Sequence, residues 1–209
     1  MTFGPAAFQA ATGVSRETLD RLCLYADVLA SWQKKINLVA SGSMPDLWRR
    51  HMLDSAQLIP LAMEFAASGV WVDLGSGAGF PGLVAAVCLP TGWTVHLIES
   101  DQRKAAFLRE AIRITGATAI VHAVRIEKLD FFPANIVSAR ALAPLADLLP
   151  FAERFWGDGT MGLFLKGRRL DDELAAVSDS WSLTYDVLSS RSDSSGRILR
   201  ARTLSRVKP

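Results

Sequence analysis

The sequence predicts an α/β fold in which a mostly parallel, seven-stranded sheet follows an N-terminal group of helices. After Gly69, short apolar runs alternate with stretches of helical periodicity, which is the pattern of a parallel sheet with crossover helices. The first of these runs, residues 70–74, leads directly into a glycine-rich segment. A polar stretch, SSRSDSSG at residues 189–196, separates the last two runs and predicts a turn that joins them as an antiparallel hairpin.

Two amphipathic helices are predicted before the sheet. Apolar residues recur at helical spacing between residues 15 and 36, behind a serine that suits an N-cap. A second helix is predicted from Ser43 to about Glu64, through the segment WRRHMLDSAQL. We therefore expect residues 1–68 to form an N-terminal helical cap and residues 69–209 to form the domain that contains the sheet.

The elements of the second part follow from the alternation of patterns. The predicted strands are residues 70–74, 93–99, 119–124, 135–139, 160–165, 182–188 and 197–203. Between the second and third strands, residues 101–115 begin with an acid and stop at Gly116, as expected for a capped crossover helix.

Length and composition restrict the possible classes of protein. A chain of 209 residues accommodates one sizeable core and a small appendage. No apolar run reaches the length of a membrane span, and residues 1–14 lack the features of a signal peptide, so we expect a cytoplasmic protein without a membrane partner. Cys23 and Cys88 are predicted to be buried thiols, and no metal is expected. The default expectation for the oligomeric state is a monomer.

Positive charge is concentrated at the C-terminal end. The net charge is only +2, but residues 191–209 hold one acid, Asp193, and six basic residues: Arg191, Arg197, Arg200, Arg202, Arg206 and Lys208. Such an end suits a contact with a phosphate backbone. The same charges would also suit a solvent-exposed edge strand, where they prevent pairing with a strand of another chain. Both interpretations stay open.

The glycine-rich segment VWVDLGSGAGFPG carries the clearest chemical signal. Gly77, Gly79 and Gly82 alone satisfy the G-x-G-x-x-G pattern of dinucleotide-binding loops. Asp73 favours a different ligand, because a carboxylate ahead of the loop repels a pyrophosphate and attracts an ammonium or a sulfonium. The order Asp73-x-Gly75-x-Gly77-x-Gly79 is typical of methyltransferases that use S-adenosylmethionine, which carries both cations. A purely structural glycine turn remains the third possibility.

Further candidate residues follow the later strands, where ligands gather in open α/β sheets. Glu99 ends the second strand at the position of an acid that binds ribose hydroxyls. Glu127 follows the third strand. It either lies beside the adenine of a bound nucleotide or is a solvated acid at the start of a helix. Arg140 follows the fourth strand and suits a carboxylate, a phosphate or a structural ion pair. Lys166 ends the fifth strand and precedes Arg168 and Arg169 in a basic cluster that either holds a polyanion or is a solvated loop.

In the cap, His51, Asp54 and Ser55 share one predicted helical face, next to Arg49 and Arg50. A histidine beside an aspartate suggests an acid/base pair. The chain has no G-x-S-x-G elbow, so we interpret His51 as a structural group rather than a catalytic one.

Several motifs together resemble the RsmG (GidB) family of bacterial methyltransferases, which act on guanine N7 in ribosomal RNA. They are INLVA and RRHMLDSAQL in the cap, then DLGSGAGFPG, LIESDQRKAAFLRE, RIEKL, SARALAPL, FLKG and GRILRAR, and they cover nearly the whole chain past residue 30. The resemblance implies a Rossmann-like class I methyltransferase fold with S-adenosyl-L-methionine as cofactor. Val39 departs from the family, which commonly has a hydroxyl residue there.

The resemblance also implies a substrate and site residues. The implied target is a guanosine in the 530 loop of 16S rRNA in the small ribosomal subunit, with 7-methylguanosine as product. Cofactor contacts are expected at Gly75, Phe80, Ile126, Glu127 and Arg140 with Asp73 and Glu99 nearby, and the loop adds Gly77 and Gly79. Our hypothesis is that Arg140 and Lys166 position the cofactor carboxylate and an RNA phosphate. The RNA would be held by Arg49, Arg50, His51, Lys166, Arg168, Arg197 and Arg200.

Three rival functions remain at this stage. A small-molecule methyltransferase would be favoured if the cap sealed a closed apolar pocket over the cofactor. An NAD-dependent oxidoreductase is disfavoured by Asp73 and by the lack of a Tyr-x-x-x-Lys pair. The third is a ribosome-associated protein that binds S-adenosylmethionine without catalysis.

Overall fold

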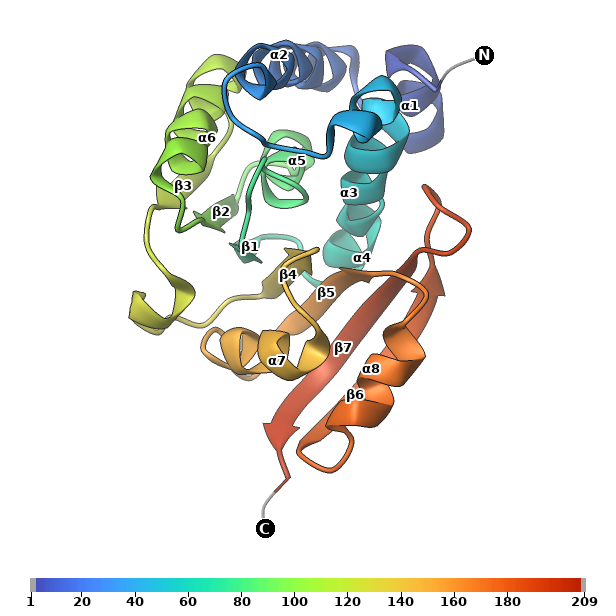
Figure 1. The fold of residues 1–209 in the computed structure, drawn as a ribbon, viewed down its shortest axis with the longest axis vertical. Coiled ribbons are helices and arrows are strands. Elements are labelled where there is room, and N and C mark those ends of the chain that lie inside the picture. The colour runs from blue at the N-terminus through green and yellow to red at the C-terminus, as the bar shows by residue number, and fades with distance from the viewer. Residues whose placement is uncertain (1–2, 208–209) are drawn as a thin grey trace.

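The computed structural model of the chain describes residues 3–207 and has a seven-stranded sheet at its centre (Figure 1). The strand order is β3-β2-β1-β4-β5-β7-β6. The strands are β1 (Gly69–Leu74), β2 (Trp93–Ile98), β3 (Ala119–His122), β4 (Ile136–Arg140), β5 (Met161–Lys166), β6 (Trp181–Ser189) and β7 (Arg197–Arg206). The first five pair in parallel, and β7 runs antiparallel to both of its neighbours. The predicted mostly parallel sheet with a terminal hairpin is confirmed.

Helices cover both faces of the sheet, which explains why its central strands are apolar throughout. On one face, Trp71 and Leu97 pack with residues of α2 (Arg16–Gln33), α5 (Gly82–Cys88) and α6 (Gln102–Thr115). On the other face, Val72 and Val137 pack with residues of α7 (Leu145–Glu153) and α8 (Leu170–Val177). Residues 136–139 of β4 are all buried. The carboxyl ends of the parallel strands are thus held in one rigid edge.

Helix α6 has the ends that the sequence predicts. The Asp101 side chain accepts hydrogen bonds from the backbone N–H groups of Arg103 (2.8 Å) and Lys104 (3.2 Å), which have no partner inside the helix. Gly116 ends the helix in the left-handed conformation, with φ of 62°.

The cap departs from the prediction in its second half. Instead of one helix from Ser43 to Glu64, the chain forms a 3-10 turn η1 (Ser41–Asp46), a π-helical turn η2 (Trp48–Leu53), a short α3 (Asp54–Ala56) and α4 (Leu58–Phe65). Pro60 accounts for the break before α4, because it cannot donate to the carbonyl of Ala56 and its ring crowds that carbonyl. A further helix, α1 (Pro5–Thr12), precedes α2 and was not predicted.

The cap shares its core with the sheet domain. Tyr25 and Leu29 of α2 belong to the same buried cluster as Phe107 and Leu108 of α6. Figure 1 shows α2 lying along the outer side of α5 and α6. The division of the chain at residues 68 and 69 stays a prediction, but the two parts are packed as one body.

Arg21 of α2 forms hydrogen bonds that link the cap to α5 and to the C-terminal end of α6. Its guanidinium donates to the carbonyls of Thr115 (2.6 Å) and Gly116 (3.0 Å) at the end of α6, and to Val87 in α5 (3.4 Å). Terminal carbonyls carry the negative end of the helix dipole and have no partner inside the helix, so a cation is stabilising there.

Two further expectations concern membrane-spanning helices and the two cysteines. None of the helices in residues 3–207 is long and apolar enough to cross a membrane. Cys23 and Cys88 are unpaired thiols, as predicted, but both are partly exposed rather than fully buried. Burial raises the pKa of Cys88 to about 12, so this thiol is protonated at neutral pH.

We predict that Arg21→Ala lowers the free energy of unfolding by about 1–3 kcal/mol, because charged hydrogen bonds to the ends of two helices are lost. Urea denaturation would measure this change. Arg16→Ala, at the exposed start of the same helix, is the matched control and should change stability little. Equal effects of the two substitutions would show that the cap is held by apolar packing alone.

Candidate functional site

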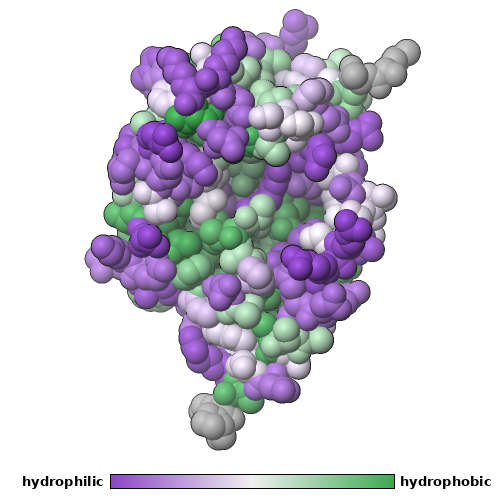
Figure 2. All heavy atoms as spheres, in the orientation of Figure 1, coloured by the Kyte–Doolittle hydropathy of each residue, from purple (hydrophilic) through white to green (hydrophobic). Residues whose placement is uncertain are grey.

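An open cavity of about 1010 Å³ lies at the carboxyl ends of the parallel strands. The segments that follow β1, β2, β3, β4 and β5 line it, together with the η1–α3 part of the cap and the turn between β6 and β7. Figure 2 shows a hollow on this face, with apolar groups inside and hydrophilic residues around it. Such a cavity at the strand ends is where an α/β sheet binds ligands.

The glycine loop has the backbone shape that its sequence predicts. Gly75, Gly77 and Gly79 all have positive φ, of 64°, 54° and 91°. Side chains rarely adopt this conformation, so the tight turn depends on glycine. Gly75 and Gly77 line the cavity, together with Phe80 at the end of the loop. The loop therefore presents backbone and one aromatic ring to a ligand.

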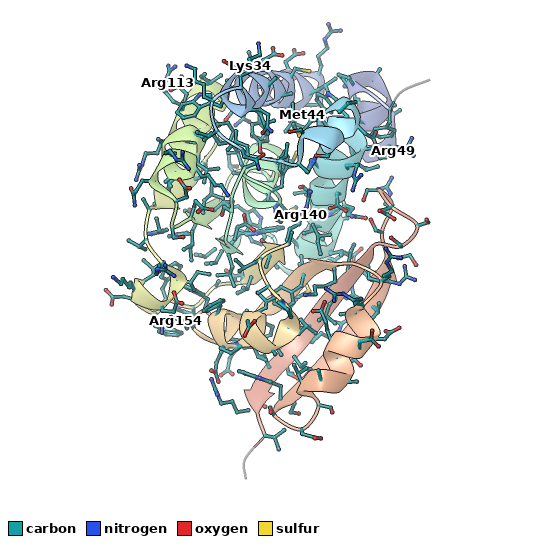
Figure 3. All side chains as sticks on the ribbon, viewed as in Figure 1. Lys34, Met44, Arg49, Arg113, Arg140 and Arg154 are labelled. Carbon is teal, nitrogen blue, oxygen red and sulfur yellow. The ribbon has the colours of Figure 1, made fainter. Side chains whose placement is uncertain are left out.

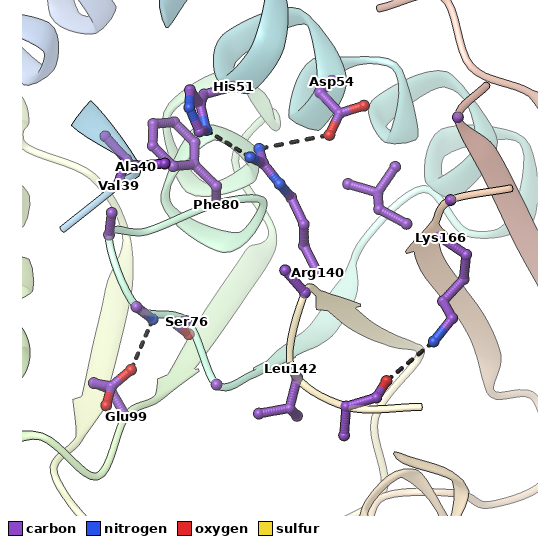
Figure 4. Close-up of a pocket in the computed structure, with 18 of the residues that line it drawn as sticks. Val39, Ala40, His51, Asp54, Ser76, Phe80, Glu99, Arg140, Leu142 and Lys166 are labelled. Atoms are coloured by element: carbon purple, nitrogen blue, oxygen red, sulfur yellow. Dashed lines mark hydrogen bonds and ion pairs between the residues drawn. The ribbon is translucent and has the colours of Figure 1, made fainter. Parts of the chain in front are cut away.

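Glu99 ties the glycine loop to the end of β2. One of its carboxylate oxygens accepts from the N–H of Gly77 (2.8 Å) (Figure 4), and the other accepts from the N–H of Asp101 (2.7 Å). The residue is 8% exposed and lines the cavity. Each oxygen keeps a second lone pair for a ligand. Ile126 and Glu127 face the same part of the cavity from the segment after β3.

Asp73 lies behind the glycine loop, which corrects the prediction of a direct cofactor contact. It is fully buried and does not line the cavity. Its carboxylate accepts from Ser138 Oγ (2.7 Å) and from the N–H of Gly82 (3.2 Å), and Ser138 Oγ accepts from Trp71 Nε1 (2.8 Å). Burial raises the pKa of Asp73 to about 6. Asp73 thus joins β1, β4 and the start of α5.

Gly79 also lies behind the loop rather than in the cavity. A Cβ at this position would lie 2.8 Å from Tyr25 Oη and 2.9 Å from Leu83 Cβ. The Tyr25 hydroxyl donates to the carbonyl of Ala78. Tyr25, which was not predicted as a site residue, therefore links α2 of the cap to the glycine loop through this hydrogen bond.

Arg140 lies at the centre of the site, where β4 ends beneath the cap (Figures 3 and 4). Its Nη2 donates to His51 Nδ1 (2.5 Å), and its Nη1 lies 3.5 Å from Asp54 Oδ2. The guanidinium carbon lies 5.5 Å from the centre of the Phe80 ring. Nη1 is buried and has no hydrogen-bond partner within residues 3–207. Arg140 also lines the cavity, so the site contains a guanidinium whose hydrogen-bonding capacity the described residues do not fully use.

His51 is a neutral acceptor in this cluster. Burial and then the charges of Arg140 and Arg50 lower its pKa to about 3. Because Nδ1 accepts from Arg140, the proton must be on Nε2, which donates to Ser43 Oγ (2.7 Å). Ser43 Oγ in turn donates to the carbonyl of Ala40 (2.6 Å). With both nitrogens engaged and 5% exposure, His51 is not available to RNA, which corrects that prediction.

Lys166 supports the loop after β4 instead of facing a substrate phosphate. Its Nζ lies 2.5 Å from Glu173 Oε2 and donates to the carbonyl of Ala143 (3.0 Å) (Figure 4). Glu173 also accepts from the N–H of Leu145 at the start of α7 (2.9 Å). The Lys166 side chain is 8% exposed. We therefore revise its predicted role from contacting a phosphate to stabilising the loop of residues 141–144.

The predicted RNA-binding residues divide into two groups. Arg50 and Arg197 line the cavity opening. Arg49, by contrast, lies over the ring of Phe3 and 3.9 Å from Asp46, and Arg168 is exposed but lies outside the cavity lining. Figure 3 shows Arg49 at the outer side of the cap.

Much of the basic tail is paired with acids, which favours the interpretation as a charged edge of the sheet. Arg200 and Arg202 lie on the same face of β7, because side chains two residues apart along a strand point to the same side. Both contact the carboxylate of Asp186 on β6. Arg206 contacts Glu153 in α7. The RNA-binding role predicted for Arg200 is thus not supported by its position. Lys208 lies outside the described residues.

Three further basic residues line the cavity, of which Lys104 and Arg125 were not predicted and Arg169 belongs to the predicted basic cluster. Lys104 lies in the first turn of α6, Arg125 precedes Ile126, and Arg169 follows the predicted Arg168. The signal for them was present in the sequence, because each follows the carboxyl end of a predicted parallel strand. Together with Arg50 and Arg197, they give the opening a basic rim.

Comparison with known proteins identifies the family. Residues 18–198 match the family model GidB, described as rRNA small subunit methyltransferase G. A protein of Parvibaculum lavamentivorans named Ribosomal RNA small subunit methyltransferase G is 54% identical over 95% of this chain and 88% of its own length. A protein of the same name from Rhodospirillum centenum is 54% identical over the whole chain and 93% of its own length.

Solved structures show the same fold at low sequence identity. The M. jannaschii TYW2 structure in complex with AdoMet superposes with a TM-score of 0.56 at 16% identity, over 83% of this chain and 80% of that one. The ribosomal protein L11 methylase of Lactobacillus delbrueckii subsp. bulgaricus gives a TM-score of 0.56 at 18% identity, over 74% and 79% of the two chains. The sheet is therefore the Rossmann-like sheet of class I methyltransferases. On the evidence of the family model and these relatives, the chain belongs to the rRNA small subunit methyltransferase G family.

Proposed function

We propose that this protein transfers the methyl group of S-adenosylmethionine to N7 of a guanosine in the 530 loop of 16S rRNA. The family and the names of its relatives support rRNA of the small subunit as the substrate. The observation that carries the proposal for the site is Arg140, which lines a cavity beside the glycine loop and whose buried Nη1 has no hydrogen-bond partner within residues 3–207.

The residues that line the cavity fit this cofactor. Arg140 would bind its carboxylate, and Glu99 has free lone pairs for the ribose hydroxyls. Gly75 and Gly77 let the ligand approach the backbone, and Phe80 contributes an apolar surface. Ile126 and Glu127 would enclose the adenine. When bound, S-adenosylmethionine supplies an electrophilic methyl group on a sulfonium, which departs as a neutral thioether.

Guanine N7 suits the protein groups around the cavity. The nitrogen has a free lone pair, so its methylation removes no proton and needs no general base. His51 is neutral with both nitrogens engaged, and Asp73 is shielded behind the loop. The task of the protein is therefore to hold the base in line with the methyl group and to exclude other orientations. Lys166 contributes by fixing the loop after β4, which borders the cavity.

The opening suits a large anionic substrate better than a small apolar one. Its rim carries Arg50, Arg125, Arg169 and Arg197, and a nearby lysine, Lys104. Such a rim attracts phosphate groups without reading sequence. The cavity is open on this face (Figure 2), so the cap does not seal it, as a small-molecule methyltransferase would require. Membership of the family likewise leaves the dehydrogenase alternative without support.

Mapping of 7-methylguanosine in rRNA tests the reaction and its site together. Borohydride and aniline cleave RNA at this base, and reverse transcription then stops there. We expect one stop in the 530 loop of 16S rRNA from cells with the gene and none from cells without it. The wild-type gene on a plasmid should restore the stop. A stop that persists in the deletion strain, or one that disappears elsewhere, would overturn the proposed target.

The neutral state of His51 predicts a specific dependence of stability on pH. In the unfolded chain a histidine takes up a proton below about pH 6.5, whereas folded His51 stays neutral until about pH 3. The unfolded state thus binds more protons in this range, so stability falls as the pH falls. His51→Asn keeps an acceptor for Arg140 but does not titrate, and it should show a shallower fall.

Denaturant unfolding at several values between about pH 7 and pH 4.5 would measure the two slopes. The slopes should differ by up to about 1.4 kcal/mol per pH unit, the value for one proton. His96 and His122 are present in both proteins, so their titration cancels in the difference. Parallel slopes would mean that His51 takes up its proton at about the same pH in the folded protein as in the unfolded chain.

A further inference from the structure

The carboxylate of Asp54 lies between Arg140 and the turn that joins β6 to β7. It is 3.5 Å from Arg140 Nη1 and accepts from Ser192 Oγ at 2.6 Å. The π-helical turn η2 and the start of α3 place both His51 and Asp54 toward Arg140 (Figure 4). The Asp54 side chain is 16% exposed, so these contacts are weakly screened by water.

The turn is docked on the cap by further hydrogen bonds. Gln57, one helical turn after Asp54, accepts from the N–H of Arg191 (2.8 Å) and donates to Ser190 Oγ (3.1 Å). Ser190 Oγ and Ser192 Oγ lie 2.8 Å apart, so the two hydroxyls and Asp54 form one network. Arg191 also donates to the carbonyl of Ala11 in α1 (2.6 Å). The first half of the turn is therefore fixed to the cap.

The same turn forms part of the cavity opening. The turn residues that line it are Ser190, Ser192, Asp193, Ser195, Gly196 and Arg197. Asp54 thus contacts both a segment that lines the cavity and the guanidinium that we propose binds the cofactor carboxylate. Its distance from Arg140 is an ion-pair distance without a hydrogen bond, and Nη1 remains unsatisfied. Asp54 Oδ1 also accepts from Gln57 Nε2 (3.0 Å) and from Ser190 Oγ (3.4 Å), but Ser192 makes the shortest of the three contacts. Without that contact the carboxylate is held less firmly and can move closer to Nη1, where it occupies the donor that a ligand needs.

We propose that Asp54 is a positioning residue through which the β6–β7 turn keeps Arg140 available to the cofactor. This inference rests on the proposed function. RNA that contacts the turn stabilises its docked position and holds the carboxylate away from Nη1. Binding of RNA and binding of the cofactor are then energetically coupled, and each raises the affinity for the other by the same factor.

Calorimetry with S-adenosylhomocysteine, which binds without turnover, tests the coupling. The full chain is titrated alone and with small ribosomal subunits from cells that lack the gene. Wild-type protein should gain affinity in the presence of subunits. Ser192→Ala should bind S-adenosylhomocysteine about fivefold or more weakly and lose most of the gain. Ser194→Ala is the matched control, because Ser194 is exposed in the same turn and is not among the residues that line the cavity.

A second variant separates positioning from mere structural support. Asp54→Asn in the Ser192→Ala background removes the charge that competes for Arg140, so it should restore affinity for S-adenosylhomocysteine. Wild-type affinity and gain in Ser192→Ala, or no restoration in the double variant, would overturn the inference. Failure of wild-type protein to bind subunits at all would instead count against the proposed function, while the titrations without subunits still test the effect of Asp54 on Arg140.

Discussion

The site depends on one buried guanidinium that its surroundings satisfy incompletely. Removing a cation from water is costly unless partners replace the solvent. Arg140 obtains a neutral acceptor from His51, a nearby carboxylate from Asp54 and an aromatic face from Phe80, yet Nη1 is left without a hydrogen bond. These partners come from the cap and the glycine loop, whereas Arg140 comes from β4. The cap, the loop and the sheet must therefore be assembled before the anion site exists, which explains why the cap shares the core of the sheet domain.

Most of the fold follows from patterns that are local in sequence. The central strands are apolar on both faces because helices cover both, and α6 is delimited by Asp101 and Gly116. The second half of the cap did not follow, because its apolar spacing suits one helix while Pro60 interrupts the hydrogen bonds of that helix. The π-helical turn around His51 has no comparable local signal. Its His51 side chain accepts a hydrogen bond from Arg140, which lies 89 residues away in sequence.

The sequence predicted which residues lie at the candidate site better than it predicted what each residue contacts. Glycine spacing and strand ends predicted Gly75, Gly77, Glu99, Glu127 and Arg140, and the family resemblance implied Phe80 and Ile126. All seven residues line one cavity. Asp73 and Lys166 were misassigned as ligand contacts, since the partners that engage them, Ser138 and Glu173, are brought there only by the folded chain. Arg200 was misassigned for the same reason, because strand pairing places it beside Asp186. The sequence shows which charges exist, but tertiary pairing decides which remain free for a ligand.

The central claim is that Arg140 binds the carboxylate of S-adenosylmethionine. The most direct measurement compares the affinities of S-adenosylhomocysteine and 5′-methylthioadenosine, which lacks the amino-acid end, for wild-type protein, Arg140→Lys and Arg140→Ala. Circular dichroism would verify that the variants are folded. We predict that wild-type protein prefers S-adenosylhomocysteine and that this preference falls about tenfold or more in both variants, because a charged, buried hydrogen bond is lost. An unchanged preference would contradict the account.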